Sequence, residues 1–463
     1  MLIGREREMA VLERLYSQRG FQFSVLFGRR RVGKTYLMSE FARERPCIFF
    51  TAVEESASAN LLNLSREIYA FDHPDADPTV APVYPNFQAA FDAVFERARS
   101  QRLVFVVDEY PYLAAADASV ASTLQLLIDR NKDDSQLFLM LCGSSLTFMR
   151  EKVLGAKSPL YGRRTAQIEL RPLDFFDARR FFPDAPVEDA VAYYGIAGGV
   201  PLYLAQFDPS LPVGENVARA LLAPDAFLYE EPLNLMRQEV TKAGTYNEVM
   251  SAIANGKTTN GEIAAEVGVK TSDLTYYLRE LQSLGLVEKR APIVGSGRRA
   301  VYRLCDNLFA FWYRFVCPYR PTIERGMPQR ALHAVEGHLT EYLGPVFERV
   351  CADWLWRKNV ADELAVSFDD LGSWWGNNPV EKREEEVDLV AVADGRPALV
   401  GECKWRSEST GENVDKTLLA RMPLFRADAS AERYVFSKGA FTEGMLERER
   451  SDERLHLVLA SEL

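Results

Sequence analysis

An eight-residue motif near the start of the chain constrains the fold most strongly. It matches the pattern G-x-x-x-x-G-K-[ST] in full, with the residues Gly28, Arg29, Arg30, Arg31, Val32, Gly33, Lys34 and Thr35. An apolar run, Phe23 to Phe27, precedes the motif, and a helix-like segment, residues 36–43, follows it. A strand, such a loop and a helix in this order are the context in which the motif binds nucleotide phosphates. The sequence therefore predicts a phosphate-binding loop.

The residue types of this loop suit ATP and Mg²⁺ as cofactors. Gly28 and Gly33 let the backbone curl until its N–H groups point at the phosphates. We expect Lys34 to reach the β- and γ-phosphates and the Thr35 hydroxyl to bind Mg²⁺. The positive end of the following helix adds to the attraction. The three consecutive arginines, residues 29–31, face either phosphate or water.

Apolar runs alternate with helical patterns through the first 170 residues. The runs cover residues 23–27, 47–51, 103–107 and 137–142. This alternation is typical of a parallel sheet with helices on its faces, and it predicts an α/β fold.

Polar residues that follow these runs are candidates for ATP hydrolysis. Asp108 directly follows the third run and would organise Mg²⁺, while Glu109 would polarise the attacking water. An Asp-Glu pair that only caps a helix gives the same pattern, but the phosphate loop favours catalysis. Ser144 or Ser145, after the fourth run, either senses the γ-phosphate or caps a helix. Arg163, beside Arg164, either reaches a neighbouring subunit's γ-phosphate or is a solvated surface residue.

Composition limits the remaining possibilities. The 463 residues suggest about three domains, and the net charge of −11 means that any DNA contact must be made through local patches. Six cysteines without a C-x-x-C pair and only four histidines make zinc sites and disulfides unexpected. The charged N-terminus and the absence of long apolar runs predict a cytoplasmic protein with no membrane partner.

Residues 244–305 have the pattern of a winged helix. A capped helix ends at Gly268, Ser272 or Asp273 is expected to cap a second helix over residues 274–284, and two short strands follow. We expect this second helix to bring Lys270, Thr271, Ser272 and Tyr276 near DNA. The wing is locally basic through Lys289, Arg290, Arg298, Arg299 and Arg303. The alternative is a module that contacts only protein.

A charged hairpin is predicted near the C-terminus. Residues 386–392 and 398–405 alternate like strands around a turn at residues 394–397. Glu402 and Lys404 then share a face, and Asp388 lies on the adjoining strand. Two carboxylates and a lysine suit Mg²⁺-dependent phosphodiester cleavage, to which Glu348 can contribute a ligand or hydrogen bond. The alternative is a surface ion pair of Glu402 with Lys404 or Arg406.

Several of these segments resemble the archaeal-type ATPases, relatives of signal-transduction and origin-recognition AAA-type ATPases. The resemblance covers residues 1–305 and rests on Gly4-Arg5 and on residues 28–35, 103–109, 160–164 and 198–203. It implies an AAA-like core, a helical lid and a winged helix. It also places Arg5 near the adenine, although a charge at a helix start explains Arg5 equally well.

The last third resembles the PD-(D/E)xK nuclease superfamily. The resemblance rests on Asp388, thirteen intervening residues, then Glu402, one residue and Lys404; the proline of the superfamily name is absent. With Phe347-Glu348 and Trp374-Trp375-Gly376, residues 306–463 also resemble an uncharacterised C-terminal domain of archaeal-type ATPases. The resemblance implies a restriction-endonuclease-like α/β domain.

The predicted domains are an ATPase core (1–170), a helical lid (171–243), a winged helix (244–305) and a nuclease-like domain (306–463). We expect an ATPase whose nucleotide state controls DNA binding and Mg²⁺-dependent DNA cleavage, which would suit defence against foreign DNA. One alternative is an ATP-dependent signalling or assembly switch with a silent nuclease-like domain. Another is an ATPase motor or chaperone without nucleic-acid chemistry. A homo-oligomer and a protein partner remain open.

Overall fold

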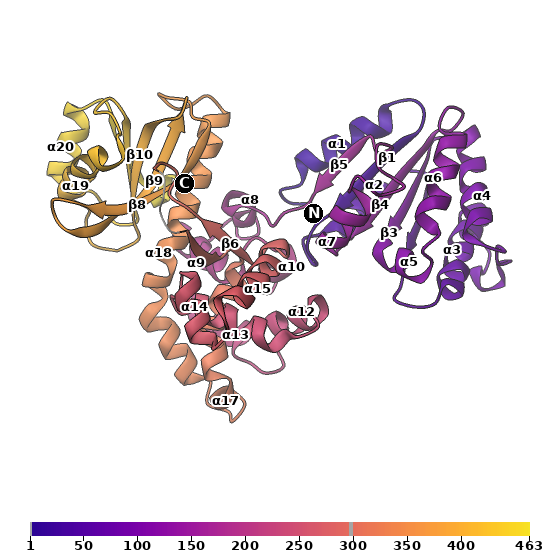
Figure 1. The fold of residues 1–463 in the computed structure, drawn as a ribbon, viewed down its shortest axis with the longest axis horizontal. Helices are drawn as coiled ribbons and strands as arrows, with labels where there is room; N and C mark the ends of the chain where they lie inside the picture. The colour runs from indigo at the N-terminus through magenta and orange to yellow at the C-terminus, as the bar shows by residue number, and fades with distance from the viewer. Residues whose placement is uncertain (1, 296–299) are drawn as a thin grey trace. The chain divides into compact units, whose positions relative to one another are not determined.

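The computed structural model describes residues 2–295 and 300–463. Two compact units are present (Figure 1). The N-terminal unit comprises the chain up to Pro172 with Val200–Leu202, and the C-terminal unit comprises Leu173–Gly199 with Tyr203–Leu463.

A five-stranded parallel sheet forms the centre of the N-terminal unit and confirms the predicted α/β core. The strand order is β2-β3-β4-β1-β5, and all pairs are parallel. The strands are β1 (Gln22–Phe27), β2 (Cys47–Thr51), β3 (Leu103–Asp108), β4 (Leu137–Gly143) and β5 (Ala166–Glu169). Every residue of β1, β3 and β4 is buried, because helices cover both faces.

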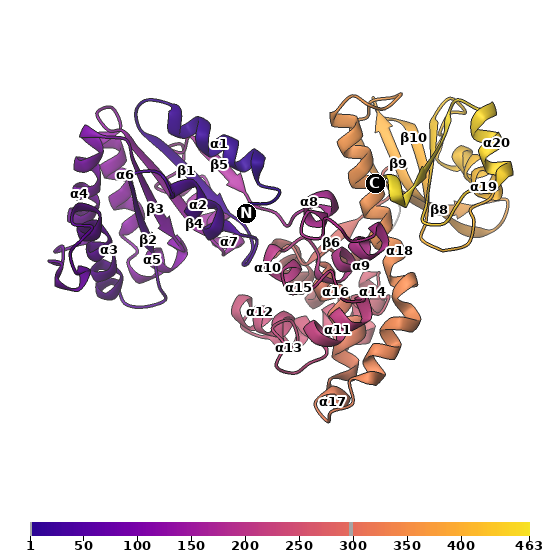
Figure 2. The ribbon, with the colours of Figure 1, turned by 180° about the vertical axis from the view of Figure 1, so that it is seen from behind.

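The helices of this unit divide between the two faces of the sheet (Figure 2). One face packs on α1 (Glu6–Ser17) and α2 (Lys34–Ala42). The other packs on α3 (Ala57–Asp72), α4 (Phe87–Ser100), α5 (Tyr110–Ala116) and α6 (Val120–Asn131). The short helix α7 (Leu146–Phe148) follows β4. Alternate strand residues therefore enter two separate cores: Val104 lies in one and Phe105 in the other.

Short helices begin the C-terminal unit. They are α8 (Phe175–Arg179), α9 (Val187–Ala197), α10 (Pro201–Leu204), α11 (Val213–Leu221) and α12 (Glu231–Glu239). The first residues of α10 belong to the N-terminal unit.

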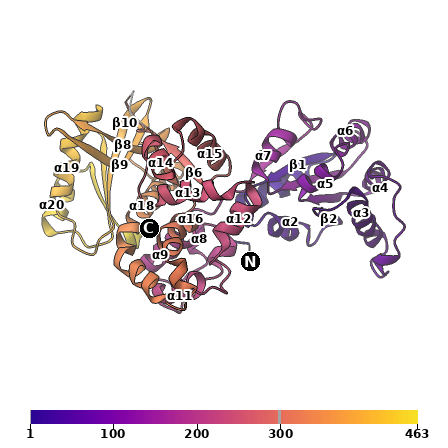
Figure 3. The same ribbon diagram turned by 60° about the horizontal axis from the view of Figure 1, so that its bottom comes forward.

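A winged-helix arrangement follows, with its helices in mutual contact (Figure 3). Its elements are α13 (Ala243–Ala254), α14 (Asn260–Val267), α15 (Thr271–Ser283), β6 (Val287–Arg290) and β7 (Val301–Leu304). Thr259 and Glu262 form a capping box, and Gly268 ends α14 with φ of 75°. The wing residues Arg298 and Arg299 lie outside the described residues.

The predicted start of α15 was wrong. The helix begins at Thr271, after Lys270 in extended conformation, so Ser272 and Asp273 lie in its first turn and not at its cap. An acidic residue is favourable near a helix start because of the helix dipole, and Asp273 is therefore well placed there without capping.

A five-stranded mixed sheet forms the last part of the chain. Its strand order is β12-β11-β10-β9-β8, with β8 to β10 antiparallel and β10 to β12 parallel. The strands are β8 (Asp370–Asn378), β9 (Arg383–Ala393), β10 (Arg396–Lys404), β11 (Glu432–Ser437) and β12 (Leu455–Leu459). The helices are α16 (Asn307–Phe311), α17 (Arg320–Ile323), α18 (Gln329–Val360), α19 (Asn413–Arg421) and α20 (Glu443–Ser451).

The predicted hairpin is confirmed by β9 and β10. Asp394 and Gly395 connect the strands with positive φ values of 49° and 75°. Two left-handed residues suit the twist of a tight hairpin, and Asp-Gly is a favoured pair for this turn. The turn fixes the register on which the charged site depends.

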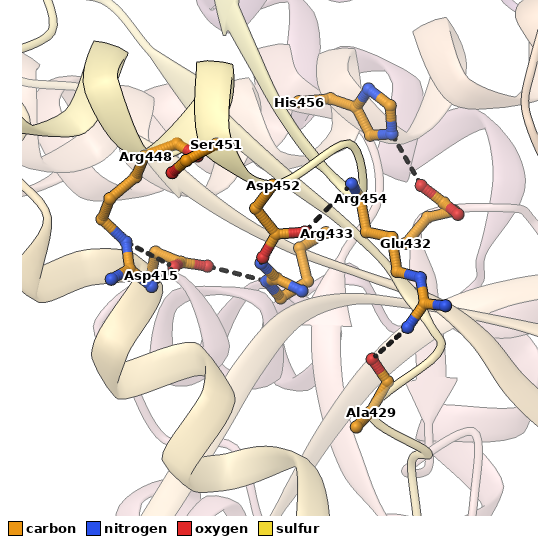
Figure 4. Close-up of polar contacts among 9 residues, drawn as sticks. All are labelled: Asp415, Ala429, Glu432, Arg433, Arg448, Ser451, Asp452, Arg454 and His456. Atoms are coloured by element: carbon orange, nitrogen blue, oxygen red, sulfur yellow. Dashed lines mark hydrogen bonds and ion pairs between the residues drawn. The ribbon is translucent and has the colours of Figure 1, made fainter.

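A buried carboxylate joins α19, β11 and α20 (Figure 4). Asp415 is fully buried and accepts hydrogen bonds from Arg433 Nε at 2.8 Å and Arg448 Nε at 2.9 Å. Arg433 also binds Asp452, which follows α20. Because each arginine of this network donates to a carboxylate, the network stabilises the packing of the helices against the sheet.

We expect Asp415→Ala to destabilise the C-terminal unit by about 3–5 kcal/mol, because two arginines lose their buried partner. All six tryptophans belong to this unit, so tryptophan fluorescence during urea unfolding reports on it selectively. Arg450→Ala is the control, since it removes an exposed pair with Glu443 and should leave the unfolding midpoint nearly unchanged. Equal midpoints for both variants would contradict the assigned role of Asp415.

Candidate functional site

The phosphate loop lies between β1 and α2, as the sequence predicted. A Cβ added at Gly28 would lie 2.3 Å from the Leu170 carbonyl oxygen, so a larger residue cannot fit there. Gly33 has a φ of 93°, a conformation that other residues rarely adopt. These two constraints explain both glycines. Gly33 immediately precedes α2, so the N-terminus of this helix ends the loop, where an anion is favoured.

Lys34 is buried within this loop. Its Nζ donates to the carbonyl oxygens of Gly28 and Arg29, each at 2.9 Å. Burial lowers the pKa of Lys34, while the nearby Cys142, Glu109 and Asp108 oppose this shift. A phosphate would give this desolvated ammonium a charged partner in place of neutral carbonyl groups.

Thr35 and Asp108 meet directly. The Thr35 hydroxyl donates to Asp108 Oδ2 at 2.7 Å, and the backbone N–H of Glu109 donates to Asp108 Oδ1 at 2.9 Å. The structure thus brings together two residues predicted to organise Mg²⁺. A hydroxyl and a carboxylate are hard oxygen donors, and they fit this ion.

Glu109 occupies a conformation that is rare for its residue type. Its φ of 51° is left-handed, at the junction of β3 and α5. Glu109 Oε2 accepts a hydrogen bond from Ser144 Oγ at 2.8 Å. Ser144 therefore orients Glu109, whereas Ser145 caps α7 through the N–H of Phe148. Strained residues concentrate at functional sites, so this geometry supports a functional role for Glu109.

Arginines around the loop have definite partners. Arg5 is buried and donates to Val32 O at 3.0 Å and Arg171 O at 2.7 Å. The first of these hydrogen bonds holds the backbone of the loop. Arg30 donates to the Tyr112 hydroxyl at 3.1 Å. The contacts of Arg5 make it a support for the loop backbone, and its predicted position near adenine remains a prediction.

Arg163 also has partners within its own unit. It binds Asp129 through Nη2 at 2.6 Å and donates from Nη1 to Pro159 O at 2.8 Å. An action of Arg163 on a neighbouring subunit would require this ion pair to open, and that role stays a prediction.

The charged hairpin brings its three predicted residues together. Gly401 pairs with Leu389, and continuing this antiparallel register places Glu402 opposite Asp388. Lys404 Nζ lies 2.5 Å from Glu402 Oε2 and 3.9 Å from Asp388 Oδ2. The N–H of Cys403 donates to Asp388 at 2.8 Å.

Burial distinguishes this site from a surface ion pair. The side chains of Glu402 and Asp388 are 5% and 16% exposed. Burial raises the pKa of Asp388 well above its usual range, and Glu402 and Glu348 raise it further. Burial alone would lower the pKa of Lys404, but Glu402 and Asp388 raise it overall. Lys404 is therefore a cation at neutral pH.

Arg421 completes the site and was missed in the sequence. Its Nη1 donates to Glu402 Oε1 at 2.9 Å, and it also pairs with Glu385 at 2.8 Å. Arg421 comes from α19, and no local motif links it to the hairpin. It holds the oxygen of Glu402 that Lys404 leaves unoccupied.

Glu348 lies on α18 and faces the wing. It pairs with Arg303 at 3.9 Å, and Arg303 also lies 3.9 Å from Glu386. Burial raises the pKa of Glu348. Within residues 2–295 and 300–463, no group of three His, Cys, Asp or Glu is arranged to hold a metal ion. Asp388 and Glu402 are the candidate pair, and Lys404 contacts both of them.

Three family models match successive parts of the chain. Residues 2–207 match an ATPase domain predominantly from Archaea, and residues 245–289 match bacterial regulatory proteins of the arsR family. Residues 312–416 match archaeal and bacterial proteins of unknown function. The uncharacterised protein MJECL04 of Methanocaldococcus jannaschii is 34% identical over 409 residues, which cover 88% of each chain. The chain belongs to this family of archaeal-type ATPases.

One solved structure shares the fold of this ATPase, and another shows a weaker similarity. The Walker-type ATPase PABY2304 of Pyrococcus abyssi is 19% identical, with a TM-score of 0.53 over 68% of this chain and 96% of that chain. The Aeropyrum pernix ORC2 protein is 16% identical, with a TM-score of 0.47 over 73% of this chain and 96% of that one. The predicted P-loop ATPase core and winged helix are confirmed. No described helix of the ATPase is long and apolar enough to cross a membrane.

Some basic residues of the winged helix are exposed, whereas others contact the C-terminal sheet and α18. The predicted residues Lys270, Thr271, Ser272 and Tyr276 are all exposed on α15 or at its start, and Arg279 is exposed beside them. In the wing, Lys289 is exposed, but Arg290 donates to Ser373 Oγ at 3.1 Å and Arg303 pairs with Glu348. Arg290 and Arg303 thus point to the C-terminal sheet and α18.

We expect Glu109→Gln to lower ATP turnover at least 100-fold while nucleotide binding persists, because an amide cannot accept a proton from water. Phosphate release and the nucleotide retained after gel filtration measure the two effects. Glu96→Gln, on the exposed face of α4, is the matched control and should match the wild type. Unchanged turnover in Glu109→Gln would remove Glu109 from the hydrolytic step.

We expect Asp388→Asn to stabilise the C-terminal unit more at pH 8 than at pH 5. Below its raised folded pKa the Asp388 carboxyl is neutral, and the native state loses stability as the pH rises through that pKa. The amide removes this loss. Urea midpoints from tryptophan fluorescence at the two pH values test the expectation, with the exposed Glu384→Gln on the same strand as control. A larger gain at pH 5 would show that the sign is wrong.

Proposed function

We propose that this ATPase uses its nucleotide state to control DNA binding by the winged helix and Mg²⁺-dependent DNA cleavage by the C-terminal domain. The observation that carries the proposal is the buried Asp388–Glu402–Lys404 hairpin in a chain that also contains a P-loop and a winged helix. Defence against foreign DNA is a biological role that would suit such a protein.

The proposal divides the chain into four domains. They are the ATPase core (1–170), a helical lid (171–243), the winged helix (244–305) and a restriction-endonuclease-like domain (306–463). The hairpin within a mixed sheet, with its acids on neighbouring strands, supports the last assignment.

ATP hydrolysis would depend on Lys34, Thr35, Asp108 and Glu109, with Ser144 and Arg163 in supporting roles. Lys34 would bind the β- and γ-phosphates, and Thr35 with Asp108 would hold Mg²⁺, which offsets charge on the phosphates. Glu109 would accept the proton of the attacking water, with Ser144 fixing its orientation. Arg163 would act on a neighbouring subunit, so this last role also proposes a homo-oligomer.

DNA cleavage would depend on opposite charges at the hairpin. Asp388 and Glu402 would hold Mg²⁺, which supplies charge stabilisation to a phosphodiester undergoing hydrolysis. Lys404 has a raised pKa, so it would donate a hydrogen bond to the attacking water or the scissile phosphate and would not act as a base. Arg421 would position Glu402, and Glu348 would contribute an additional acid near Asp388.

DNA binding would use the exposed face of α15. A helix-turn-helix places its second helix in the major groove, and α15 is the second of the two consecutive helices α14 and α15. Its Lys270 and Arg279 would bind phosphates or base edges, and Tyr276 is 59% exposed. The match to arsR-type regulatory proteins supports this use.

A second candidate function is a switch that assembles with a protein partner while the hairpin stays silent. One observation favours it: Arg303 lies between Glu348 and Glu386 and already neutralises acids beside the site. In that case ATP would control assembly and no DNA would be cut.

A cleavage assay separates the two functions. We expect the wild type to nick or cut plasmid DNA with ATP and Mg²⁺ or Mn²⁺, and Asp388→Ala to lose at least 100-fold in rate while it still binds DNA. In Lys34→Ala, the rate of DNA cleavage should no longer depend on added ATP. Glu384→Ala is the control on the same strand.

The same preparations test DNA binding. Arg279→Ala should weaken DNA binding several-fold and lower the slope of log affinity against log salt concentration by about one unit, because one phosphate contact is lost.

If the wild type leaves single- and double-stranded DNA intact with every metal and nucleotide, the assembly switch replaces the nuclease as the proposed function.

A further inference from the structure

A cavity lies within the C-terminal unit, between the winged helix and α18. Its volume is about 440 Å³. Residues from the end of α13, from β7, from α16 and from α18 line it. The volume falls in the range of about 300–1,000 Å³ that is common for small-molecule sites. The hairpin with Asp388 and Glu402 does not line this cavity.

Three arginines line the cavity, and a single carboxylate accompanies them. Arg303 comes from β7, Arg314 follows α16 and Arg349 comes from α18, whereas Glu341 supplies the acid. The lining therefore carries an excess of positive charge. These side chains come from three separate segments of the chain, and the fold brings them to one space.

The pairing of the three arginines is incomplete. Arg314 binds Glu341 at 2.8 Å, but the carboxylates nearest to Arg303 remain at 3.9 Å. Arg349 donates to the neutral amide oxygen of Asn307, and no carboxylate of the described residues forms an ion pair with it. Arg303 thus keeps only long ion pairs, and Arg349 has the carboxylates of Glu348 and Asp353 within electrostatic range but forms an ion pair with neither.

Apolar residues form much of the remaining lining, beside the polar Asn255, Thr258 and Tyr342. Tyr302, Leu304, Pro345 and Val346 form much of its wall. Apolar walls with a few convergent polar groups are typical of sites that bury an organic ligand. An ion-sized anion would leave these walls without a partner.

We propose that this cavity binds a small organic molecule that carries at least one phosphate group. A phosphate ester has a charge of about −1.5 to −2 at neutral pH, which matches the excess charge better than one carboxylate does. Arginine forks bind phosphate oxygens in pairs, and the apolar wall would cover the organic part. The lining includes neither the phosphate loop nor Asp388, Glu402 or Lys404, although its Arg303 also pairs with Glu386 of the hairpin, and the proposed function does not depend on the cavity.

The test uses full-length protein with Lys34→Ala, so that the phosphate loop does not mask the result. AMP and inorganic pyrophosphate are the probes, and isothermal titration calorimetry measures their dissociation constants. We expect saturable binding of at least one probe. Arg349→Gln should weaken it at least tenfold. Arg330→Gln, at an exposed position on the same helix, should leave it unchanged.

A second variant keeps every arginine. Ala310 lines the cavity, and Ala310→Phe should fill it and weaken binding of AMP at least tenfold. If Arg349→Gln fails to fold, which tryptophan fluorescence would reveal, Ala310→Phe tests whether the probes bind in the cavity. In these titrations, two results would overturn the proposal: no saturable binding of either probe, or equal binding in the parent and in the folded variants.

A DNA arm distinguishes a free phosphate ester from a phosphate of nucleic acid. A short DNA duplex is titrated into the Lys34→Ala parent and into the Arg349→Gln variant. The proposal expects equal DNA affinity in both. Tenfold weaker duplex binding in Arg349→Gln, with no binding of AMP or pyrophosphate, would assign the cavity to nucleic acid and overturn the proposal.

Discussion

The hydrogen bond between Thr35 and Asp108 joins the two halves of the nucleotide site. Thr35 follows β1 and Asp108 ends β3, and these strands are separated in the sheet by β4. Because all three strands are parallel, their carboxyl ends meet at one edge, where α/β proteins bind ligands. Ser144, after β4, then reaches Glu109 across the same edge. One sheet order therefore positions the lysine, the hydroxyl and both acids.

Two buried carboxylates of the C-terminal unit differ in how well nearby cations compensate their charge. Asp415 has two arginine partners, and its network holds helices against the sheet. Asp388 faces Glu402, and its nearest cation, Lys404, lies 3.9 Å away. The first arrangement satisfies its charge, whereas the second leaves a desolvated acid with too little compensation. An acid that costs stability in a recessed site is typical of a functional position.

Local motifs predicted the phosphate loop, the parallel sheet and the hairpin of Asp388, Glu402 and Lys404. In each case the residues are close in sequence or the strand period fixes their faces. Arg421 and Arg349 were not predicted, because they reach their sites from helices whose packing no local pattern specifies. The start of α15 was misplaced because Ser and Asp are common caps, while the backbone turned at Lys270.

The orientation of the wing arginines changes how DNA binding must be explained. The chain has a net charge of −11, and two basic residues of the wing, Arg290 and Arg303, face the C-terminal domain. Among the described residues, the exposed cations of the winged helix therefore gather on α15 and at Lys289. Arg303 also holds Glu348, whose charge contributes to the raised pKa of Asp388. Movement of Arg303 toward DNA would take one of three nearby arginines away from Glu348 and raise the pKa of Asp388 further. A cation bound at Asp388 and Glu402 would offset this change, so DNA binding and metal binding would favour each other through one arginine.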